Sequence, residues 1–166
     1  EMRQGRLKDE RAEDRGAGDE DSASAADLSR KLRALESTEL FSGLNRRQLR
    51  LLAFGARWYE AAPGTAVFHK DDAATDGAYM IIEGEAGLYL PAESEGAEGQ
   101  LIAKVGPGRL VGELGLIRKE PRALSMIAES DLTCLRIGEE EFLAVVENDA
   151  NTAFKLLQVV AGYLSS

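Results

Sequence analysis

The stretch between Val105 and Ser125 contains residues that together could bind a small anion. Gly112 and Gly115 would let the backbone approach a ligand closely, because glycine has no Cβ atom. Residues 113–118 could form a short helical turn, which would end before a proline at position 121. Exposed backbone N–H groups at the start of such a turn form an anion site.

Two charged side chains flank this turn. Arg122 is a fixed cation that can contact two phosphate oxygens at once. Glu113 offers a carboxylate that would repel a phosphate but accept hydrogen bonds from sugar hydroxyls. A ligand with one phosphate charge and a ribose would use the turn, the arginine and the carboxylate together. The residues by themselves leave a second interpretation open, in which Glu113 and Arg122 form a structural ion pair.

Composition excludes several other kinds of site. The chain has 166 residues and a net charge of −9, which argues against nucleic-acid binding because phosphate neutralisation dominates that affinity. No apolar run approaches the roughly 20 residues needed to span a bilayer, so we expect no membrane span in this segment. One histidine, His69, and one cysteine, Cys134, cannot form a multi-histidine or cysteine-rich metal cluster. We therefore expect no metal site and no catalytic residue, and we expect Cys134 to be a small buried hydrophobe.

The elements that must position these residues are mainly short strands. A two-residue period, interrupted by glycine and turn clusters at intervals of roughly 8–12 residues, is typical of an all-β sandwich, jelly roll or barrel. The pattern predicts strands at residues 57–61, 65–69, 78–83, 85–90, 100–105, 125–128 and 132–137.

Helical periodicity flanks the strands on both sides. Apolar residues at helical spacing predict a short helix over residues 28–35 and a second from Asn45 to about Gly55. Asn45 is the expected N-cap of that second helix, and Gln48 three residues later completes a capping box. A helix is also expected after Gly138, and a last one over residues 151–164. The predicted architecture is therefore helices, a β-roll, and helices again.

The first 27 residues differ from the rest of the chain. They hold nine acids and five bases, for a charge of −4, and Met2 and Leu7 are their only large apolar residues. Such a stretch buries too little apolar surface to offset its ordering entropy. We predict that residues 1–27 form an acidic linker or tail, which could also extend a solvated helix, and that residues 28–166 form one domain. Since the chain begins with Glu1, we expect it to be a piece of a longer protein.

The motif around the anion-binding turn resembles a known family. Val-Gly-Glu-Leu-Gly-Leu-Ile at 111–117, followed by Pro-Arg-Ala at 121–123, is similar to the phosphate-binding cassette of the cyclic nucleotide-binding domain family. That family includes kinase regulatory subunits, cyclic-nucleotide-gated channels and the bacterial catabolite activator. The resemblance extends over about residues 40–164, and includes Leu-Phe-x-Gly-Leu at 40–44 and Tyr-x-Ile-x-x-Gly at 79–84.

The resemblance implies a fold and a ligand site. The fold would be mainly β with flanking α, a β-roll or double-stranded jelly roll with N-terminal helices, a short phosphate-binding helix and C-terminal helices. The implied ligand-binding residues are Gly112, Glu113, Leu114, Gly115, Arg122 and Ala123. Backbone amides around Leu114 and Gly115 would face the cyclic phosphate, and Arg122 would pair with its exocyclic oxygens. Glu113 would accept from the ribose 2′-hydroxyl.

The resemblance also implies a function. The chain would be a non-enzymatic regulatory domain without a cofactor, and its ligand would be cyclic AMP rather than cyclic GMP, because Ala123 lacks the hydroxyl that often accompanies cyclic GMP preference. Binding would be transmitted through the C-terminal helices to an effector domain attached upstream of residue 1. An effector that precedes this domain in the chain would fit a membrane transporter or channel with the domain at its C-terminal, cytoplasmic end. The C-terminal helix, whose surface is almost wholly apolar, could also form a homodimer.

Two other functions stay open. One is a ligand-free dimerisation or interaction module with the same fold, although intact Glu113 and Arg122 argue against it. The other is the sensor domain of a transcription regulator that has been cut before its DNA-binding part. Within the resemblance, one departure concerns the turn at Lys70–Asp72, where Asp71 stands at a position that is commonly glycine in the family.

Overall fold

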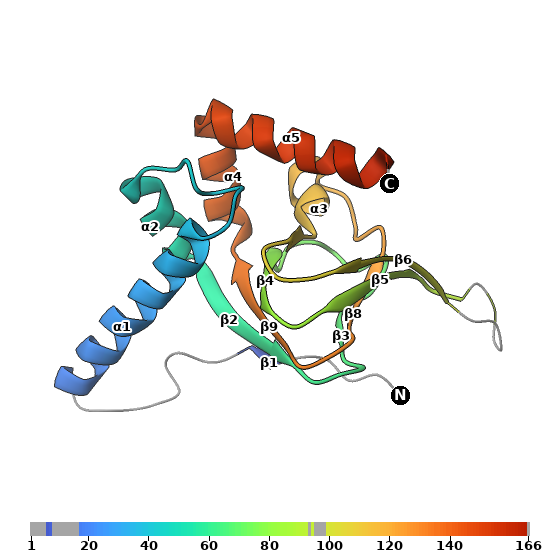
Figure 1. The fold of residues 1–166 in the computed structure, drawn as a ribbon, viewed down its shortest axis with the longest axis horizontal. Coiled ribbons are helices and arrows are strands. Elements are labelled where there is room, and N and C mark those ends of the chain that lie inside the picture. The colour runs from blue at the N-terminus through green and yellow to red at the C-terminus, as the bar shows by residue number, and fades with distance from the viewer. Residues whose placement is uncertain (1–5, 8–16, 93, 95–98, 166) are drawn as a thin grey trace.

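The computed structural model describes residues 6–7, 17–92, 94 and 99–165. Two helices, α1 (Ala17–Glu36) and α2 (Arg46–Phe54), lie between the first strand and the other strands, and a short helix, α3 (Glu113–Arg118), lies between the seventh and eighth strands. Two more helices, α4 (Glu139–Asn148) and α5 (Ala150–Ser165), close the chain (Figure 1). The strands are β1 (Arg6–Leu7), β2 (Ala56–Ala61), β3 (Ala66–Phe68), β4 (Ala78–Glu83), β5 (Ala86–Leu90), β6 (Gln100–Val105), β7 (Leu110–Val111), β8 (Ser125–Ala128) and β9 (Leu132–Ile137).

The strands form two antiparallel sheets. One has the order β1-β2-β9-β4-β7 and the other the order β3-β8-β5-β6. Side chains from both sheets meet in one buried cluster that includes Ile81, Met126 and Cys134. The predicted mainly β fold with flanking helices, a β-roll, is therefore confirmed. Cys134 is fully buried as predicted, and burial raises the pKa of its thiol to about 12.

A second core lies between the five-stranded sheet and the helices. It joins Leu35 of α1 and Leu52 of α2 to Met80 and Leu135 of the sheet and to Phe142 of α4. Met80 and Leu135 are direct partners in the register of β4 with β9. This core fixes the helices on the outer face of the sheet, while α3 lies at one end of the roll (Figure 1).

The predicted capping box of α2 is confirmed. The Gln48 backbone N–H donates to the Asn45 side chain over 2.8 Å, and the Asn45 N–H donates to the Gln48 side chain over 2.9 Å. All seven predicted strands are present, although β3 is shorter than expected. The two-residue strands β1 and β7 were not predicted, because so few residues leave no periodicity to detect.

Helix α1 is longer than predicted and crosses the predicted domain boundary at residue 27. It begins at Ala17, where the sequence has no apolar period that would indicate a helix. Besides the packing of Leu35 in the core, two polar contacts attach α1 to the roll: the Trp58 indole donates to Asp27 over 2.7 Å, and the buried Lys31 amine donates to the Ala56 carbonyl over 2.8 Å. Asp27 also forms an ion pair with Lys31 at 3.1 Å. Residue 27 is thus bonded to the roll, while the assignment of residues 1–27 as a linker stays a prediction.

The two C-terminal helices begin close to the predicted positions. Phe154 and Leu157 of α5 are 62% and 67% exposed, so these two side chains are not covered by the described part of the chain. Within the described part of the chain, no helix is both long enough and apolar enough to cross a membrane.

Candidate functional site

Helix α3 begins at a glycine whose backbone is in the left-handed region. Gly112 is its N-cap with φ of 87°, a conformation that L side chains rarely adopt. A Cβ atom at this position would also lie 2.3 Å from Nη1 of Arg122. Both the backbone conformation and the contact with Arg122 therefore require glycine here. Through this contact, Arg122 packs directly against the start of α3.

The backbone of Arg122 is held by the turn at residues 71–72. Its N–H donates to the Asp72 carbonyl, and its carbonyl accepts from the Asp71 N–H, each over 2.8 Å. Asp71 has φ of 74°, so this residue adopts the conformation that a glycine at its position would adopt freely. Aspartate tolerates the left-handed region better than most residues, which explains how the turn forms without glycine.

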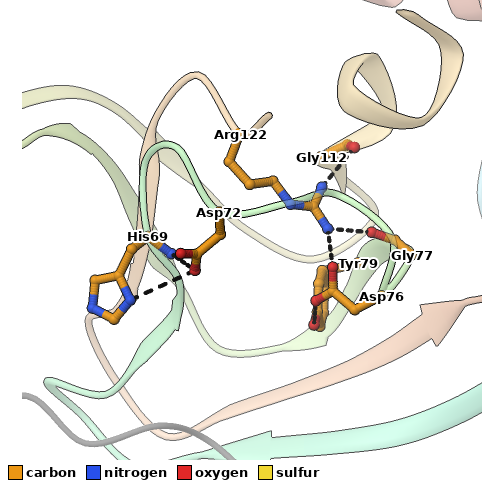
Figure 2. Close-up of polar contacts among 7 residues, drawn as sticks. All are labelled: His69, Asp72, Asp76, Gly77, Tyr79, Gly112 and Arg122. Atoms are coloured by element: carbon orange, nitrogen blue, oxygen red, sulfur yellow. Dashed lines mark hydrogen bonds and ion pairs between the residues drawn. The ribbon is translucent and has the colours of Figure 1, made fainter. Parts of the chain in front are cut away.

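The guanidinium of Arg122 is buried and points back into the protein. Nη2 donates to Asp76 Oδ1 over 2.7 Å and to the Gly77 carbonyl over 2.6 Å, while Nη1 donates to the Gly112 carbonyl over 2.8 Å (Figure 2). Nε has no hydrogen-bond partner among the described residues. The ion pair of this arginine is therefore with Asp76, and the pairing with Glu113 that the sequence left open does not form.

Two aromatic rings complete the surroundings of the guanidinium. Its central carbon lies 4.3 Å from the Phe68 ring centroid and 6.0 Å from that of Tyr79. The Tyr79 hydroxyl donates to the other oxygen of Asp76 over 2.6 Å. Burial and this hydrogen bond raise the pKa of Tyr79 well above its usual range. Asp76 thus joins Arg122 to Tyr79, a residue of β4 (Figure 2).

Glu113, the first residue of α3, is buried without a full set of partners. Its side chain is 2% exposed, and Oε1 accepts no hydrogen bond from the described residues. Burial raises the pKa of this carboxyl to about 7, although its own backbone N–H and the charges of Arg109 and Arg122 act in the opposite direction. A hydroxyl group of a ligand could donate to the unsatisfied oxygen and favour the ionised form.

The structure brings most of the expected ligand-binding residues together. Gly112, Glu113 and Gly115 lie on one continuous stretch, and Arg122 contacts the first of them. Ala123 follows Arg122 and is exposed, whereas the Leu114 side chain lies outside the described residues. The glycines were expected to make room for a ligand. In the structure, the space beside both glycines is filled by other residues of the protein: a Cβ on Gly112 would lie 2.3 Å from Arg122 Nη1, and one on Gly115 would lie 2.6 Å from the Ala74 Cβ.

Sequence reasoning missed Asp76, Phe68 and Tyr79 as members of this site. One signal for Asp76 was present: a single carboxylate stands in the turn directly before a buried strand. A buried arginine requires a carboxylate or several carbonyls, because its charge is costly to remove from water. The sequence alone did not reveal which of the many acids would supply it.

Other parts of the described chain offer less chemistry. The His69 imidazole lies 3.7 Å from Asp72, and no group of three or more His, Cys, Asp or Glu among the described residues could hold a metal ion. A cleft of about 420 Å³ lies between α1 and the five-stranded sheet. It is lined by Arg30, Arg33, Ala34, Trp58, Glu60, Ile82, Glu83 and Thr133, none of which belongs to the Glu113–Arg122 site.

The sequence model of the family described as "Cyclic nucleotide-binding domain" matches residues 59–149, more than half of the chain and the whole of the site just described. The chain belongs to the cyclic nucleotide-binding domain family, which agrees with the resemblance of its cassette.

Particular relatives come from different kinds of protein. The chain is 27% identical over 129 residues to the cyclic AMP receptor protein of Thermus thermophilus, covering 76% of this chain and 57% of that one. It is 24% identical over 131 residues to the potassium channel KAT3 of Arabidopsis thaliana, covering 79% and 19%. It therefore spans only part of the length of these relatives. Its fold is similar to that of the regulatory domain of Toxoplasma gondii PKA with cAMP, with a TM-score of 0.72, 22% identity, and 86% and 52% of the two chains covered.

Proposed function

We propose that the chain is a non-enzymatic regulatory domain that binds a cyclic nucleotide between α3 and Arg122. The observation that carries the proposal is the pair of buried charges at the two ends of the cassette. Glu113 is buried with an unsatisfied oxygen, and Arg122 is buried in the conformation that the glycine at position 112 allows. Burying a carboxylate without partners is unfavourable for stability, so a use in binding would explain why it is there.

Each group of the cassette has a chemical role in this proposal. The backbone N–H groups of Leu114 and Gly115 face the cyclic phosphate, and the amide of Ala123 supplies another donor. Arg122 neutralises the phosphate charge through the donors that its internal bonds leave free. Glu113 accepts from the ribose 2′-hydroxyl, which satisfies its unpaired oxygen and stabilises the ionised carboxylate.

We propose cyclic AMP as the ligand in preference to cyclic GMP. Ala123, directly after Arg122, has no hydroxyl that could form a hydrogen bond with a guanine. The named relatives point in the same direction: the Thermus protein is called a cyclic AMP receptor protein, and the Toxoplasma domain was crystallised with cAMP.

Transmission to an effector is the further part of the proposal. Ligand held by the cassette favours one arrangement of α4 and α5 against the roll, and this population shift biases an attached effector. The exposed Phe154 and Leu157 give α5 an apolar face, which a second copy could cover in a homodimer. We propose that residues 28–166 form the domain, that residues 1–27 link it to an effector such as a transporter or channel, and that it works in the cytoplasm.

A thermal-shift screen tests the proposed ligand. Cyclic AMP, cyclic GMP and cyclic dinucleotides are added at millimolar concentration, and we expect the melting temperature to rise most with cyclic AMP. A ligand at 100 times its dissociation constant stabilises by about 2.7 kcal/mol, which shifts the melting of a domain of this size measurably. No shift with any cyclic nucleotide would contradict the proposal.

One observation favours a second candidate, a ligand-free interaction module. Three of the five N–H groups of the Arg122 guanidinium already donate within the protein, including both on Nη2. A phosphate that needs two parallel bonds from this arginine would have to displace Asp76 or a carbonyl. Under this candidate, Arg122 has a structural role, and its replacement lowers stability without changing any nucleotide binding. The sensor domain of a transcription regulator stays a third possibility, which the sequence of the whole parent protein would decide.

A further inference from the structure

The outer face of α2 combines positive charge with exposed apolar side chains. Arg46, Arg47 and Arg50 are exposed, and so are Leu51 and Phe54, at 41% and 85%. These five residues are called the α2 surface below. No acidic residue occurs in this helix, and within the described part of the chain none of the three arginines forms a salt bridge.

The α2 surface is continuous. At 100° per residue, its five side chains fall within an arc of about 140° around the helix axis. The opposite side of α2 carries Leu49, Leu52 and Ala53, which are buried in the core. Figure 1 shows α2 at an outer corner of the molecule, beside α4 and the start of β2. The surface is therefore a projecting helix face and not the wall of a groove.

We propose that the α2 surface docks onto a membrane surface that contains anionic phospholipids. A guanidinium pairs with phosphodiester oxygens through two parallel hydrogen bonds, and three arginines lie side by side here. Phe54 lies between them on the same arc, where its ring can enter the boundary between headgroups and acyl chains. Helices that lie in the plane of a membrane interface combine basic side chains with aromatic and leucine side chains that enter the boundary, and the α2 surface presents both kinds.

The composition and the size of the surface favour a membrane over a protein partner. Stable protein interfaces use about 20–30 residues on each side, whereas this surface has five. Acidic residues limit it on both sides: Glu39 is exposed in the loop before α2, and Glu141 of α4 lies beside Gly55 at the end of α2. The chain as a whole carries −9. Docking therefore uses the α2 surface, and it is weak, reversible and sensitive to salt.

Co-sedimentation with vesicles tests the proposal. Wild-type protein is mixed with vesicles of phosphatidylcholine alone or with about 30% phosphatidylserine, at about 50 mM and about 500 mM salt. We expect binding to the phosphatidylserine vesicles at low salt only. Arg46→Gln, Arg47→Gln and Arg50→Gln together should lower the partition coefficient about 100-fold, since each base near an anionic surface contributes about a factor of five.

A matched variant removes the same charge from other exposed positions. Arg33→Gln, Lys104→Gln and Arg118→Gln together lower the net charge equally but leave the α2 surface intact, so binding should stay within about twofold of wild type. Equal loss in both triple variants, or equal binding of wild type to both kinds of vesicle, would overturn the proposal. So would concentration-dependent self-association without lipid that the α2 triple variant abolishes, because the surface would then join two copies.

A probe on Phe54 keeps the test independent of the arginine variants. Phe54→Cys can be labelled selectively with an environment-sensitive dye, because Cys134 is fully buried. We expect a blue shift of the emission when phosphatidylserine vesicles are added and none with phosphatidylcholine alone. An unchanged spectrum under conditions where the protein sediments with vesicles would show that another surface makes the contact.

Discussion

Glu113→Gln is expected to stabilise the ligand-free domain at neutral pH and to weaken its binding of a cyclic nucleotide. Burial raises the pKa of Glu113 from 4.5 to about 7. In the folded state the group therefore keeps its proton at pH values where the unfolded chain has lost it. Because the folded state binds more protons in this window, stability falls as the pH rises from about 4.5 to about 7.

The size of the effect follows from that difference in pKa. Raising a carboxyl pKa from 4.5 to about 7 corresponds to an unfavourable contribution of about 3 kcal/mol once the group is ionised in the folded state. Glutamine has nearly the same shape and no charge to bury, so it should recover most of this at about pH 8. At about pH 4.5 or below, the carboxyl is neutral in the folded state and the two proteins should differ little.

Urea denaturation at about pH 5 and about pH 8 measures this directly, with Trp58 fluorescence as the signal, since the chain has one tryptophan. The stability difference between Glu113→Gln and wild type should grow by about 2–3 kcal/mol between the two pH values. Other titrating groups affect both proteins alike and cancel in the difference. A difference that does not change with pH, or a variant less stable than wild type at the higher pH, would refute the reasoning.

The same variant should lose affinity for the ligand. A hydrogen bond from a hydroxyl to a charged group contributes about 1.5–3 kcal/mol, so affinity for the cyclic nucleotide should fall about 10- to 100-fold. Binding to wild type near pH 7 should also release protons, because a donor to the carboxylate lowers its pKa again. Calorimetry in buffers of different ionisation enthalpy detects this release, which should be absent in Glu113→Gln. Proton release that persists in the variant would assign it to another group.

Three further predictions concern the residues that hold the site. Asp76→Asn should lower the unfolding free energy by about 1–3 kcal/mol in urea denaturation, because Arg122 loses its charged partner; an unchanged value would show that the two backbone carbonyls suffice. Gly112→Ala should lower the unfolding free energy by at least about 1 kcal/mol more than Gly64→Ala does. Both glycines have φ near 85°, but only at position 112 would the new methyl group meet Arg122. Equal losses in the two variants would argue against the close packing. Asp71→Gly should raise the melting temperature slightly, corresponding to about 0.5–1 kcal/mol, because its φ of 74° is unfavourable for a side chain; a lower melting temperature would mean that the Asp71 side chain is stabilising.

The sequence predicted the features that depend on neighbouring residues. The capping box of Asn45 and Gln48 follows from a spacing of three residues, and the strands follow from a two-residue period. The helical turn predicted over residues 113–118 is present as α3. These features are predictable because the capping contacts form within one helical turn and the alternation that marks a strand lies within that strand.

The features that sequence reasoning missed depend on contacts between distant segments. Asp76 and Arg122 are 46 positions apart, and only the folded roll brings the turn before β4 beside the loop after α3. The surplus of acids in the chain gave no indication of which one would be buried. Likewise, helical spacing identified α5 but not that Phe154 would be exposed, because a helix that is apolar on nearly every side does not define which face is covered.

Isothermal titration calorimetry with cyclic AMP tests the central claim most directly. Wild type is compared with Arg122→Ala, and with Arg118→Ala as a control that removes an exposed arginine from the same cassette. Circular dichroism checks that each variant is folded. We predict measurable binding to wild type, similar binding to Arg118→Ala, and an affinity about 10- to 1,000-fold lower for Arg122→Ala. Equal affinity of wild type and a folded Arg122→Ala protein would contradict the assignment of the site.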